Sequence, residues 1–483
     1  MANSYLKRAV STGTNQKTWT VSAWVKAGLI TGASRTIFGS DVEDDGSNYA
    51  TLSIEADGLL KFINQQGGSL VTNFQSNRKL LDVTSFYHIV LRIDTTQGTA
   101  GDRVRIYING EQVVSWAYST NSASQNADTG VFKSGNATLV GARHSSSSQN
   151  FWDGNIAHVH IISGQSHPPS VFGETDSTTG GWKPKLLPTG ITYDSENSAF
   201  LKFENPSALG TDSSGQSNTF TVGGNLKQSI STVSNLFNTL NANEGYYTSI
   251  ASAIKYAGTG WEDASTGNDG VKGITGTLGM ASGKWYYEMK YISPAMYSEF
   301  GIAKANTLAS SKLINDTQRS PWYQGNEGDG FGFRVGSTAT VIMRGDNTEV
   351  QWTTDGSTNI AVATNGQICM CAFDLDAGKI WWGINGTWNT VPGSTTTTSS
   401  AQIASGANAH KTWTPTGAFY RTGHSEYNRF GNAAAQKLNF GEGRFGTDAV
   451  ASGNADSAGE GVFEFAPPEN FLAICTSNIK NTG

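Results

Sequence analysis

The chain has 483 residues, of which 57 are glycine, 11 are proline and 15% are charged, with a formal net charge of −6. Hydrophobic residues make up 37% and aromatic residues 11%, which is enough apolar surface for packed cores and excludes a disordered chain. The glycines have no three-residue period, which excludes collagen. The acidic balance, without a basic run, argues against nucleic-acid binding. No apolar stretch approaches ~20 residues, so we expect no membrane insertion.

The first third of the chain contains runs in which apolar and polar residues alternate, and this period of two predicts half-buried β-strands. Such runs cover residues 18–25, 88–94 and 156–162. Residues 104–108 form another, and the Asn109-Gly110 that follows is a strong β-hairpin signal. Turn-forming residues separate these runs, so we predict an antiparallel β-sandwich.

A second set of predicted strands begins after residue 280. Its last run ends in Asn385-Gly386, a second hairpin signal. This set predicts a second sandwich, and its strands cover residues 284–291, 299–303, 328–334, 368–374 and 379–384.

One segment between the two sets competes with an all-β fold. Its apolar residues are spaced 4, 3, 4 and 3 apart, which is a heptad rhythm. They are Leu226, Ile230, Val233, Phe237 and Leu240. The rhythm lasts only about two heptads, and stable coiled coils usually need three or four. Ser, Thr and Asn fill the gaps and weaken helix propensity. We expect an irregular connector, with a trimerising helix as the alternative.

Groups that could bind a metal are few. Cys369 and Cys371 lie two apart in an apolar run and are interpreted as small buried hydrophobic residues. His158 and His160 lie on a predicted strand. They could be a pair of metal ligands, but we favour two residues on the solvated face of a sandwich.

An acidic loop offers weak calcium candidates, Asp41, Glu43 and Asp45. Carboxylate oxygens suit this hard cation, but the spacing is not that of an EF-hand, and a solvated turn is the favoured interpretation. We therefore expect no cofactor, and calcium is the only ion considered.

Aromatic residues in predicted loops are the best binding candidates. Trp322 and Tyr323 follow Pro321, Trp388 follows the hairpin turn, and Trp413 precedes Pro415. Such rings can stack on sugars or anchor a protein interface. The alternative is that each ring caps its own sandwich.

Two known domain types resemble the two strand sets. Residues 1–185 resemble a laminin-G-like, concanavalin A-like jelly roll, through residues 19–25, 86–90, 104–110 and 153–159. Residues 261–450 resemble a SPRY domain, through residues 284–288, 328–333 and 373–386. These resemblances imply an all-β fold with a β-rich connector over 186–260 and a C-terminal tail over 451–483.

Three further segments resemble virion proteins of tailed bacteriophages, especially marine ones. They are the start at residues 1–6, the linker at 201–203 and 209–215, and the closing motif at 465–479. This resemblance implies a phage structural protein made in the bacterial cytoplasm and carried on the virion.

The chain lacks the carboxylate pattern of concanavalin A-like glycosidases, which need an acid and a base or nucleophile across the sugar ring. Glu55-Ala56-Asp57 comes nearest, but no third carboxylate follows. Nucleophile-elbow, zinc-protease and phosphate-loop motifs are also missing from the sequence. We therefore predict a non-enzymatic protein without catalytic residues. A depolymerase with a site built from distant loops is the least favoured alternative.

The resemblance implies a tail fibre or receptor-binding component that recognises host surface polysaccharide. Its expected partners are other virion proteins, host glycan and further copies of itself, with a trimer favoured. Because the jelly-roll pattern begins within the first 25 residues, we expect no separate attachment domain before it. A capsid or tail decoration or adaptor protein is therefore the alternative.

Overall fold

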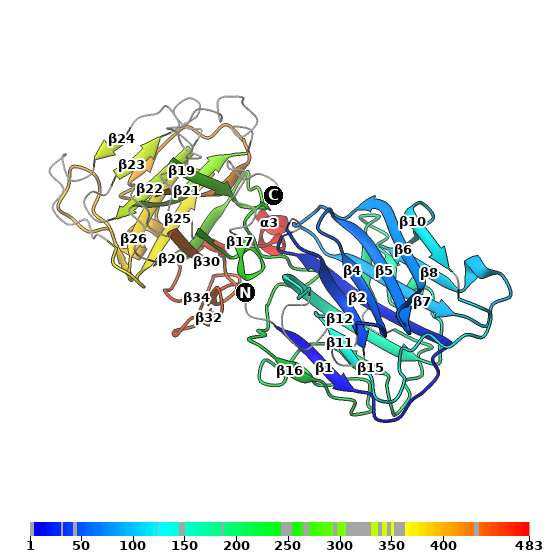
Figure 1. The fold of residues 1–483 in the computed structure, drawn as a ribbon. Coiled ribbons are helices and arrows are strands. Elements are labelled where there is room, and N and C mark those ends of the chain that lie inside the picture. The colour runs from blue at the N-terminus through cyan, green and yellow to red at the C-terminus, as the bar shows by residue number, and fades with distance from the viewer. Residues whose placement is uncertain are drawn as a thin grey trace. The chain divides into compact units, whose positions relative to one another are not determined.

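The structure is a computed structural model of the chain, which forms two compact units, Met1–Val233 (unit 1) and Ser234–Gly483 (unit 2) (Figure 1). Both are built from β-sheets in which almost all strand pairs are antiparallel, the exception being β20 with β35, so the predicted all-β class with two sandwiches is confirmed. The structure describes residues 4–29, 32–41, 46–121, 123–143, 150–185, 188–242, 254–263, 270–292, 297–305, 330–336, 341–344, 349–351, 363–428 and 434–482.

Unit 1 has two sheets. The first has eight strands, which in spatial order are β10 (Trp116–Asn121), β6 (Ser69–Lys79), β5 (Leu59–Gln66), β4 (Tyr49–Ile54), β3 (Arg35–Asp41), β11 (Ala137–Val140), β1 (Tyr5–Ala9) and β16 (Thr221–Gly223). The second has six strands, which are β15 (Ala199–Leu201), β12 (Gly154–Ser163), β2 (Thr18–Ala27), β7 (Tyr87–Asp94), β8 (Val104–Ile108) and β9 (Glu111–Gln112). A short hairpin, β13 (Gly173–Thr175) and β14 (Trp182–Pro184), lies outside them.

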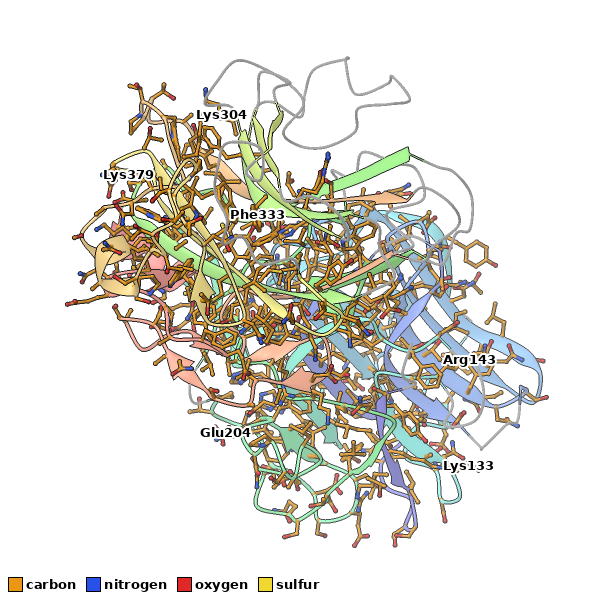
Figure 2. The ribbon with its side chains drawn as sticks, turned by 90° about the vertical axis from the view of Figure 1, so that its left-hand side faces the viewer. Lys133, Arg143, Glu204, Lys304, Phe333 and Lys379 are labelled. Carbon is orange, nitrogen blue, oxygen red and sulfur yellow. The ribbon has the colours of Figure 1, made fainter. Side chains whose placement is uncertain are left out.

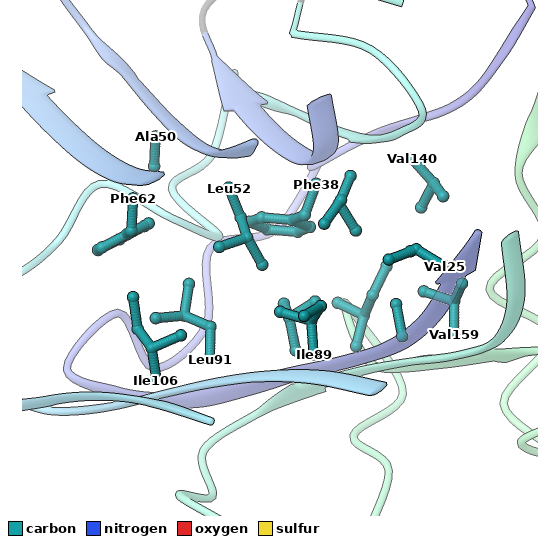
Figure 3. Close-up of a cluster of buried hydrophobic side chains, with 14 of the residues drawn as sticks. Val25, Phe38, Ala50, Leu52, Phe62, Ile89, Leu91, Ile106, Val140 and Val159 are labelled. Carbon is teal, nitrogen blue, oxygen red and sulfur yellow. The ribbon is translucent and has the colours of Figure 1, made fainter. Parts of the chain in front are cut away.

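The core of unit 1 lies between these two sheets. Alternate residues of each strand point inward, because successive side chains of a strand leave opposite faces. Figure 3 shows part of this core, including Phe38, Leu52 and Phe62 from the eight-stranded sheet and Ile89 and Ile106 from the six-stranded sheet.

The segment expected to be a connector belongs largely to unit 1. Its short strands extend the two sheets, because β15 pairs with β12 and β16 pairs with β1. Asp212 orders the loop between them by accepting the backbone N–H groups of Phe200, Ser214 and Asn218 at 2.9 Å each. The heptad segment contains no helix over residues 226–240, so the irregular connector is the structure that forms there.

Unit 2 is also built on two sheets. The larger follows the order β17 (Ile254–Lys255), β18 (Gly260–Asp263), β30 (Ala434–Asn439), β20 (Lys284–Ile292), β25 (Ile368–Asp374), β26 (Lys379–Ile384) and β27 (Thr387–Trp388), with β28 (Lys411–Thr412) beside β26 and β35 (Leu472–Ala473) beside β20. The smaller follows β19 (Gly270–Thr275), β29 (Tyr420–Asn428), β21 (Tyr297–Lys304), β22 (Gly330–Gly336), β23 (Val341–Arg344) and β24 (Glu349–Gln351). Short hairpins β31 (Arg444–Phe445) with β32 (Asp448–Ala449) and β33 (Asn454–Ala455) with β34 (Val462–Phe463) complete it.

Aromatic residues dominate the core of unit 2. Phe333 stacks on Trp382 with ring centroids 5.6 Å apart and lies deep among the packed side chains (Figure 2). Cys369 and Cys371 are fully buried in the same core as free thiols, as small hydrophobic residues would be. Burial raises the pKa of both thiols, which keeps them protonated and unreactive.

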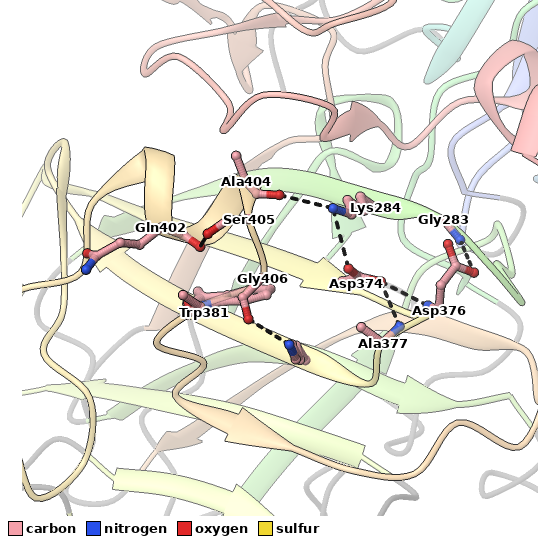
Figure 4. Close-up of polar contacts among 12 residues, drawn as sticks. Gly283, Lys284, Asp374, Asp376, Ala377, Trp381, Gln402, Ala404, Ser405 and Gly406 are labelled. Carbon is pink, nitrogen blue, oxygen red and sulfur yellow. Dashed lines mark hydrogen bonds and ion pairs between the residues drawn. The ribbon is translucent and has the colours of Figure 1, made fainter.

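A polar network fastens the short helix α2 (Ser400–Ala404) to the larger sheet (Figure 4). Lys284 donates to the carbonyl of Ala404 at 3.2 Å and lies 3.7 Å from the carboxylate of Asp374. Asp374 accepts the N–H groups of Asp376 and Ala377, which shapes the turn into β26. The carboxylate of Asp374 therefore serves local structure.

The expected C-terminal tail packs on unit 2. Phe471, Ala473 and Cys475 are buried in one cluster with residues of the larger sheet, and the chain then forms helix α3 (Thr476–Thr482). The residues at the end of the chain thus complete the unit. No helix in the described part of the chain has the length and hydropathy to span a lipid bilayer.

Candidate functional site: a polar sheet face on unit 1

A row of polar side chains crosses the eight-stranded sheet of unit 1. Ser53 on β4 lies opposite Lys61 on β5, which lies opposite Gln75 on β6, which lies opposite Tyr118 on β10. The next row includes Asn73 on β6, opposite Thr120 on β10. We name this surface the polar sheet face and define it by Ser53, Lys61, Asn73, Gln75 and Tyr118.

These side chains point away from the core. Their neighbours along the strands, Leu52, Phe62 and Phe74, belong to the buried cluster between the sheets. Since successive side chains of a strand alternate, the polar set lies on the outer face. Tyr118 is 48% exposed at the edge of the sheet, so its ring is accessible to a ligand.

One carboxylate is anchored beside this face. Glu55, which follows β4, accepts hydrogen bonds from Ser53 Oγ at 2.7 Å and Ser34 Oγ at 3.0 Å. Lys61 Nζ lies 3.9 Å from the same carboxylate. At this separation on a partly exposed surface the ion pair is weak, so the ammonium of Lys61 retains the capacity to donate to a ligand.

Two further features add to the recognition chemistry of the face. The guanidinium of Arg143 lies 3.9 Å from the ring centroid of Tyr49 on β4, in a cation–π contact. Asn73 Oδ1 is buried and has no hydrogen-bond partner among the described residues. A buried amide oxygen without a partner costs free energy, but neighbouring atoms cover it, so a ligand hydroxyl reaches it only after the side chain moves.

The face combines an ammonium, amides, hydroxyls and an exposed aromatic ring. Sugar hydroxyls both donate and accept hydrogen bonds, and sugar rings have apolar faces that aromatic rings cover. The arrangement can therefore bind a neutral polar ligand such as a glycan. The carboxylates nearest to a glycosidase pattern are used locally, because Asp57 accepts the N–H of Leu59 and Glu55 is bound as described.

The structure places the four aromatic candidates differently. Trp322 and Tyr323 lie outside the described residues. Trp388 was expected in a loop, but it is only 4% exposed, lies in the second cluster of unit 2 and donates its indole N–H to Ser400 Oγ at 3.1 Å. Its position after the hairpin turn puts it on β27, which pairs with β26. Trp388 is thus a packing residue.

Trp413 has an intermediate position. Its ring packs against Phe331 and Tyr420, with centroids 4.8 and 5.8 Å away. The loop that follows is exposed and ends in Phe419, which is 60% exposed. Trp413 therefore packs under this loop against Phe331 and Tyr420, and Phe419 is the aromatic ring of the loop that is exposed to solvent.

Of the three calcium candidates, the structure describes only Asp41. Asp41 ends β3, where it is 2% exposed and pairs with Tyr49, so it belongs to a strand and not to a solvated loop. Glu43 and Asp45 lie outside the described residues. Among the residues that the structure describes, no group of three or more His, Cys, Asp or Glu side chains could hold a metal ion.

The two histidines of β12 do not share a solvated face, contrary to the prediction. The strand has an irregular register between Ala157 and His160, and His158 has a φ of 47°. His160 is buried, stacks on Phe200 at 3.9 Å and shares a hydrogen bond with the hydroxyl of Tyr193 at 2.7 Å. Burial lowers the pKa of His160 well below its ordinary value, so the ring is neutral and structural.

Sequence reasoning did not find the polar sheet face. The strands that carry it, β4, β5 and β6, alternate apolar and polar residues, so the period-two signal was present. Sequence alone does not show that Ser53, Lys61, Gln75 and Tyr118 form one row, because the register of four strands decides it.

Comparison with known protein families agrees with the fold predicted for the first part of the chain. Residues 2–171 match the laminin-G family model described as "Concanavalin A-like lectin/glucanases superfamily", so a concanavalin A-like domain is confirmed there. No curated protein matches the chain.

Three solved structures are similar to parts of the chain. The native heptameric SAP-like pentraxin from Limulus polyphemus is 13% identical, with 46% of this chain and 89% of that chain covered and a TM-score of 0.29. The SPRY domain of human HERC1 is 11% identical, with 41% and 96% covered and a TM-score of 0.26. Domains LG4-5 of the mouse laminin alpha1 chain are 10% identical, with 90% and 86% covered and a TM-score of 0.28.

Proposed function

We propose that this chain is a non-enzymatic glycan-binding protein and that the polar sheet face of unit 1 contacts the glycan. The observation that carries the proposal is the row Lys61, Gln75 and Tyr118, which sets an ammonium, an amide and an exposed ring side by side on one sheet, next to the buried Ser53. The matched family includes lectins by its description, which supports the same class of ligand. No cofactor takes part in this proposal.

Each such contact is weak, because a sugar exchanges bound water for protein groups of similar strength. Several copies of the face on one particle would raise the apparent affinity by avidity. We therefore propose a homo-oligomer, and the phage resemblance favours a trimer. Light scattering on the purified chain tests this number, and a monomer at micromolar concentration would contradict it.

The specific role we propose is that of a tail fibre or receptor-binding component on a tailed bacteriophage virion, which meets polysaccharide on the host surface. The support is the resemblance of residues 1–6, 201–203, 209–215 and 465–479 to virion proteins. Locating the protein on intact virions by cryo-electron microscopy tests the role. A protein that bound tail or capsid components and ignored host cells would instead be a decoration or adaptor protein.

A glycan array of bacterial surface polysaccharides tests the general proposal, with the full chain as the probe. We expect saturable binding to a small set of glycans, without release of reducing ends from them. Release of reducing ends would identify a depolymerase, and absence of binding to every glycan would contradict the proposal.

The same array tests the aromatic candidates of unit 2. If the loop after Trp413 contributes, Phe419→Ala weakens binding and leaves stability unchanged, since this ring is exposed. Trp322→Ala and Trp413→Ala are also expected to weaken it. For Trp413→Ala the thermal stability must be measured as well, because its ring packs on Phe331 and Tyr420.

A further inference from the structure

A pocket of about 320 Å³ opens at the other end of the eight-stranded sheet of unit 1, against the paired strands β1 and β16. Tyr5 and Lys7 line it from β1, and Thr221 and Gly223 line it from β16. In the strand order, β1 and β16 lie at the opposite end from β10 and β6. The pocket is therefore separate from the polar sheet face.

The pocket depends on close packing of β16 against β1. A Cβ atom on Gly223 would overlap the ring of Tyr5, so only glycine lets this ring lie across the strand. The segment before β16 also contains a glycine that is packed too closely for a side chain. The N–H of Phe220 donates to the carbonyl of Gly210 at 2.8 Å, and a Cβ atom on Gly210 would overlap the carbonyl of Phe220.

The loop that leads into β16 is held rigidly by side chains. Asp212 accepts the N–H of Asn218 at 2.9 Å, and Asn218 Oδ1 accepts Arg8 Nη2 at 2.6 Å. Since β16 lies outside the matched residues 2–171, one wall of the pocket comes from outside the concanavalin A-like match. The linker motif at 209–215 thus has a structural role, which is to build this wall.

The lining of the pocket is cationic and rich in donors. Lys7 contributes the charge, and Thr219 and Thr221 contribute hydroxyls. Arg8 follows Lys7 on β1 and so leaves the opposite face of the strand, as the buried Leu6 does, and its guanidinium donates to Asn197 and Asn218. None of the described residues that line the pocket carries a carboxylate. Arg8 is positioned by Asn218 and lies in the field of Asp194, Glu196 and Asp212, which offsets part of its charge. Lys7 is therefore the cation on the face of β1 that Tyr5 shares.

We propose that this pocket binds one carboxylate-bearing sugar, a uronate residue of an acidic polysaccharide. The sugar carboxylate would bind the ammonium of Lys7 through a charge-assisted hydrogen bond. The hydroxyls of Thr219 and Thr221 would bind the ring hydroxyls, and the ring of Tyr5 would cover an apolar sugar face. The volume suits a small ligand. This inference rests on the proposed glycan-binding function and narrows its ligand class.

Two monosaccharides that differ at one carbon test it, because D-glucuronate carries a carboxylate where D-glucose carries a hydroxymethyl group. Ligand-observed NMR titrations of the full chain are expected to show glucuronate binding about tenfold or more tightly than glucose. Lys7→Gln is expected to abolish this preference, and Thr221→Val is expected to weaken both sugars. The control Lys79→Gln removes an exposed charge from the end of β6. It is expected to leave the affinity for glucuronate and the affinity for glucose unchanged.

Equal binding of the two sugars, no detectable glucuronate binding, or a preference that survives Lys7→Gln would each overturn the inference. Melting temperatures of all variants must match the wild type, and a variant that fails this is replaced by Lys7→Met, which keeps the apolar stem. If polysaccharides bind on the array without a preference for uronate, the inferred uronate binding at the pocket is wrong and the proposed glycan-binding function still stands. If neither polysaccharide binding on the array nor glucuronate binding by NMR is detected, the proposed function and the uronate inference are both wrong.

Discussion

The carboxylate of Glu288 on β20 accepts the backbone N–H of Phe465 at 2.8 Å. Its two oxygens also accept the hydroxyl of Tyr286, the amide of Asn439 and the N–H of Glu464, at 3.0 to 3.1 Å. One fully buried side chain therefore fastens the C-terminal segment to the larger sheet of unit 2.

This carboxylate makes the stability of unit 2 depend on pH. Burial raises the pKa of Glu288 to about 7, above the ordinary 4.5. Because the folded state then holds the proton more tightly than the unfolded state, this group's contribution falls as pH rises from about 4.5 through 7, by an amount on the order of 3 kcal/mol. The neutral histidines His410 and His424 act in the opposite direction, since burial lowers the pKa of each to about 3.

Glu288→Gln isolates this contribution. The variant does not ionise, so we expect the melting temperature of unit 2, measured by calorimetry from pH 5 to pH 8, to lose the part of its pH dependence that Glu288 supplies. The variant is also less stable at pH 5, by about 1–3 kcal/mol, because the new amide group faces two hydrogen-bond donors. Glu204→Gln, at an exposed site in unit 1, is the control. Parallel pH profiles for wild type and Glu288→Gln would contradict this assignment.

A hydrogen bond to the buried His88 tests the packing of unit 1. Trp182 Nε1 donates to His88 Nδ1 at 2.9 Å, and His88 Nε2 lies 2.8 Å from Ser22 Oγ. An indole only donates, so Nδ1 must be the acceptor and the ring is neutral, in agreement with a pKa that burial lowers to about 3.

Trp182→Phe leaves His88 Nδ1 buried without a donor. We expect a loss of about 1–3 kcal/mol in the unfolding free energy of unit 1, which corresponds to about 2–4 °C in melting temperature for each kcal/mol. Trp116→Phe is the matched control, because its half-buried indole packs on Phe74. Equal losses of unfolding free energy in the two variants would show that the loss comes from the smaller buried ring and not from the hydrogen bond.

The loop before β16 gives a third prediction. Gly210→Ala places a methyl group against the backbone carbonyl of Phe220, which cannot move without breaking the pairing of β16. We expect a loss of about 1–3 kcal/mol or more, together with loss of glucuronate binding at the β1–β16 pocket. Gly98→Ala, where a Cβ atom meets open space, is expected to be neutral in both measurements. An unchanged melting temperature in Gly210→Ala would contradict the packing described.

Sequence patterns predicted the strands that alternate strongly, and residues 18–25, 88–94 and 104–108 lie in β2, β7 and β8. They did not predict where long-range pairing places a residue. His160 follows an irregular register in β12 and is buried, and Trp388 is fixed by pairing with β26. The polar sheet face was missed for the same reason, because it exists only once four strands are in register.

The central claim is that the polar sheet face binds glycan, and the affinity of a Tyr118 variant tests it most directly. Tyr118→Ala removes an exposed ring at the sheet edge, so the fold and melting temperature are expected to remain unchanged. On the tightest-binding polysaccharide from the array, we expect affinity to fall about tenfold, which is the effect of losing one stacked ring and its hydrogen bond. Ser119→Ala, on the same strand, is expected to bind like the wild type. Unchanged affinity in Tyr118→Ala, and in Tyr118→Ala combined with Gln75→Ala, would contradict the claim.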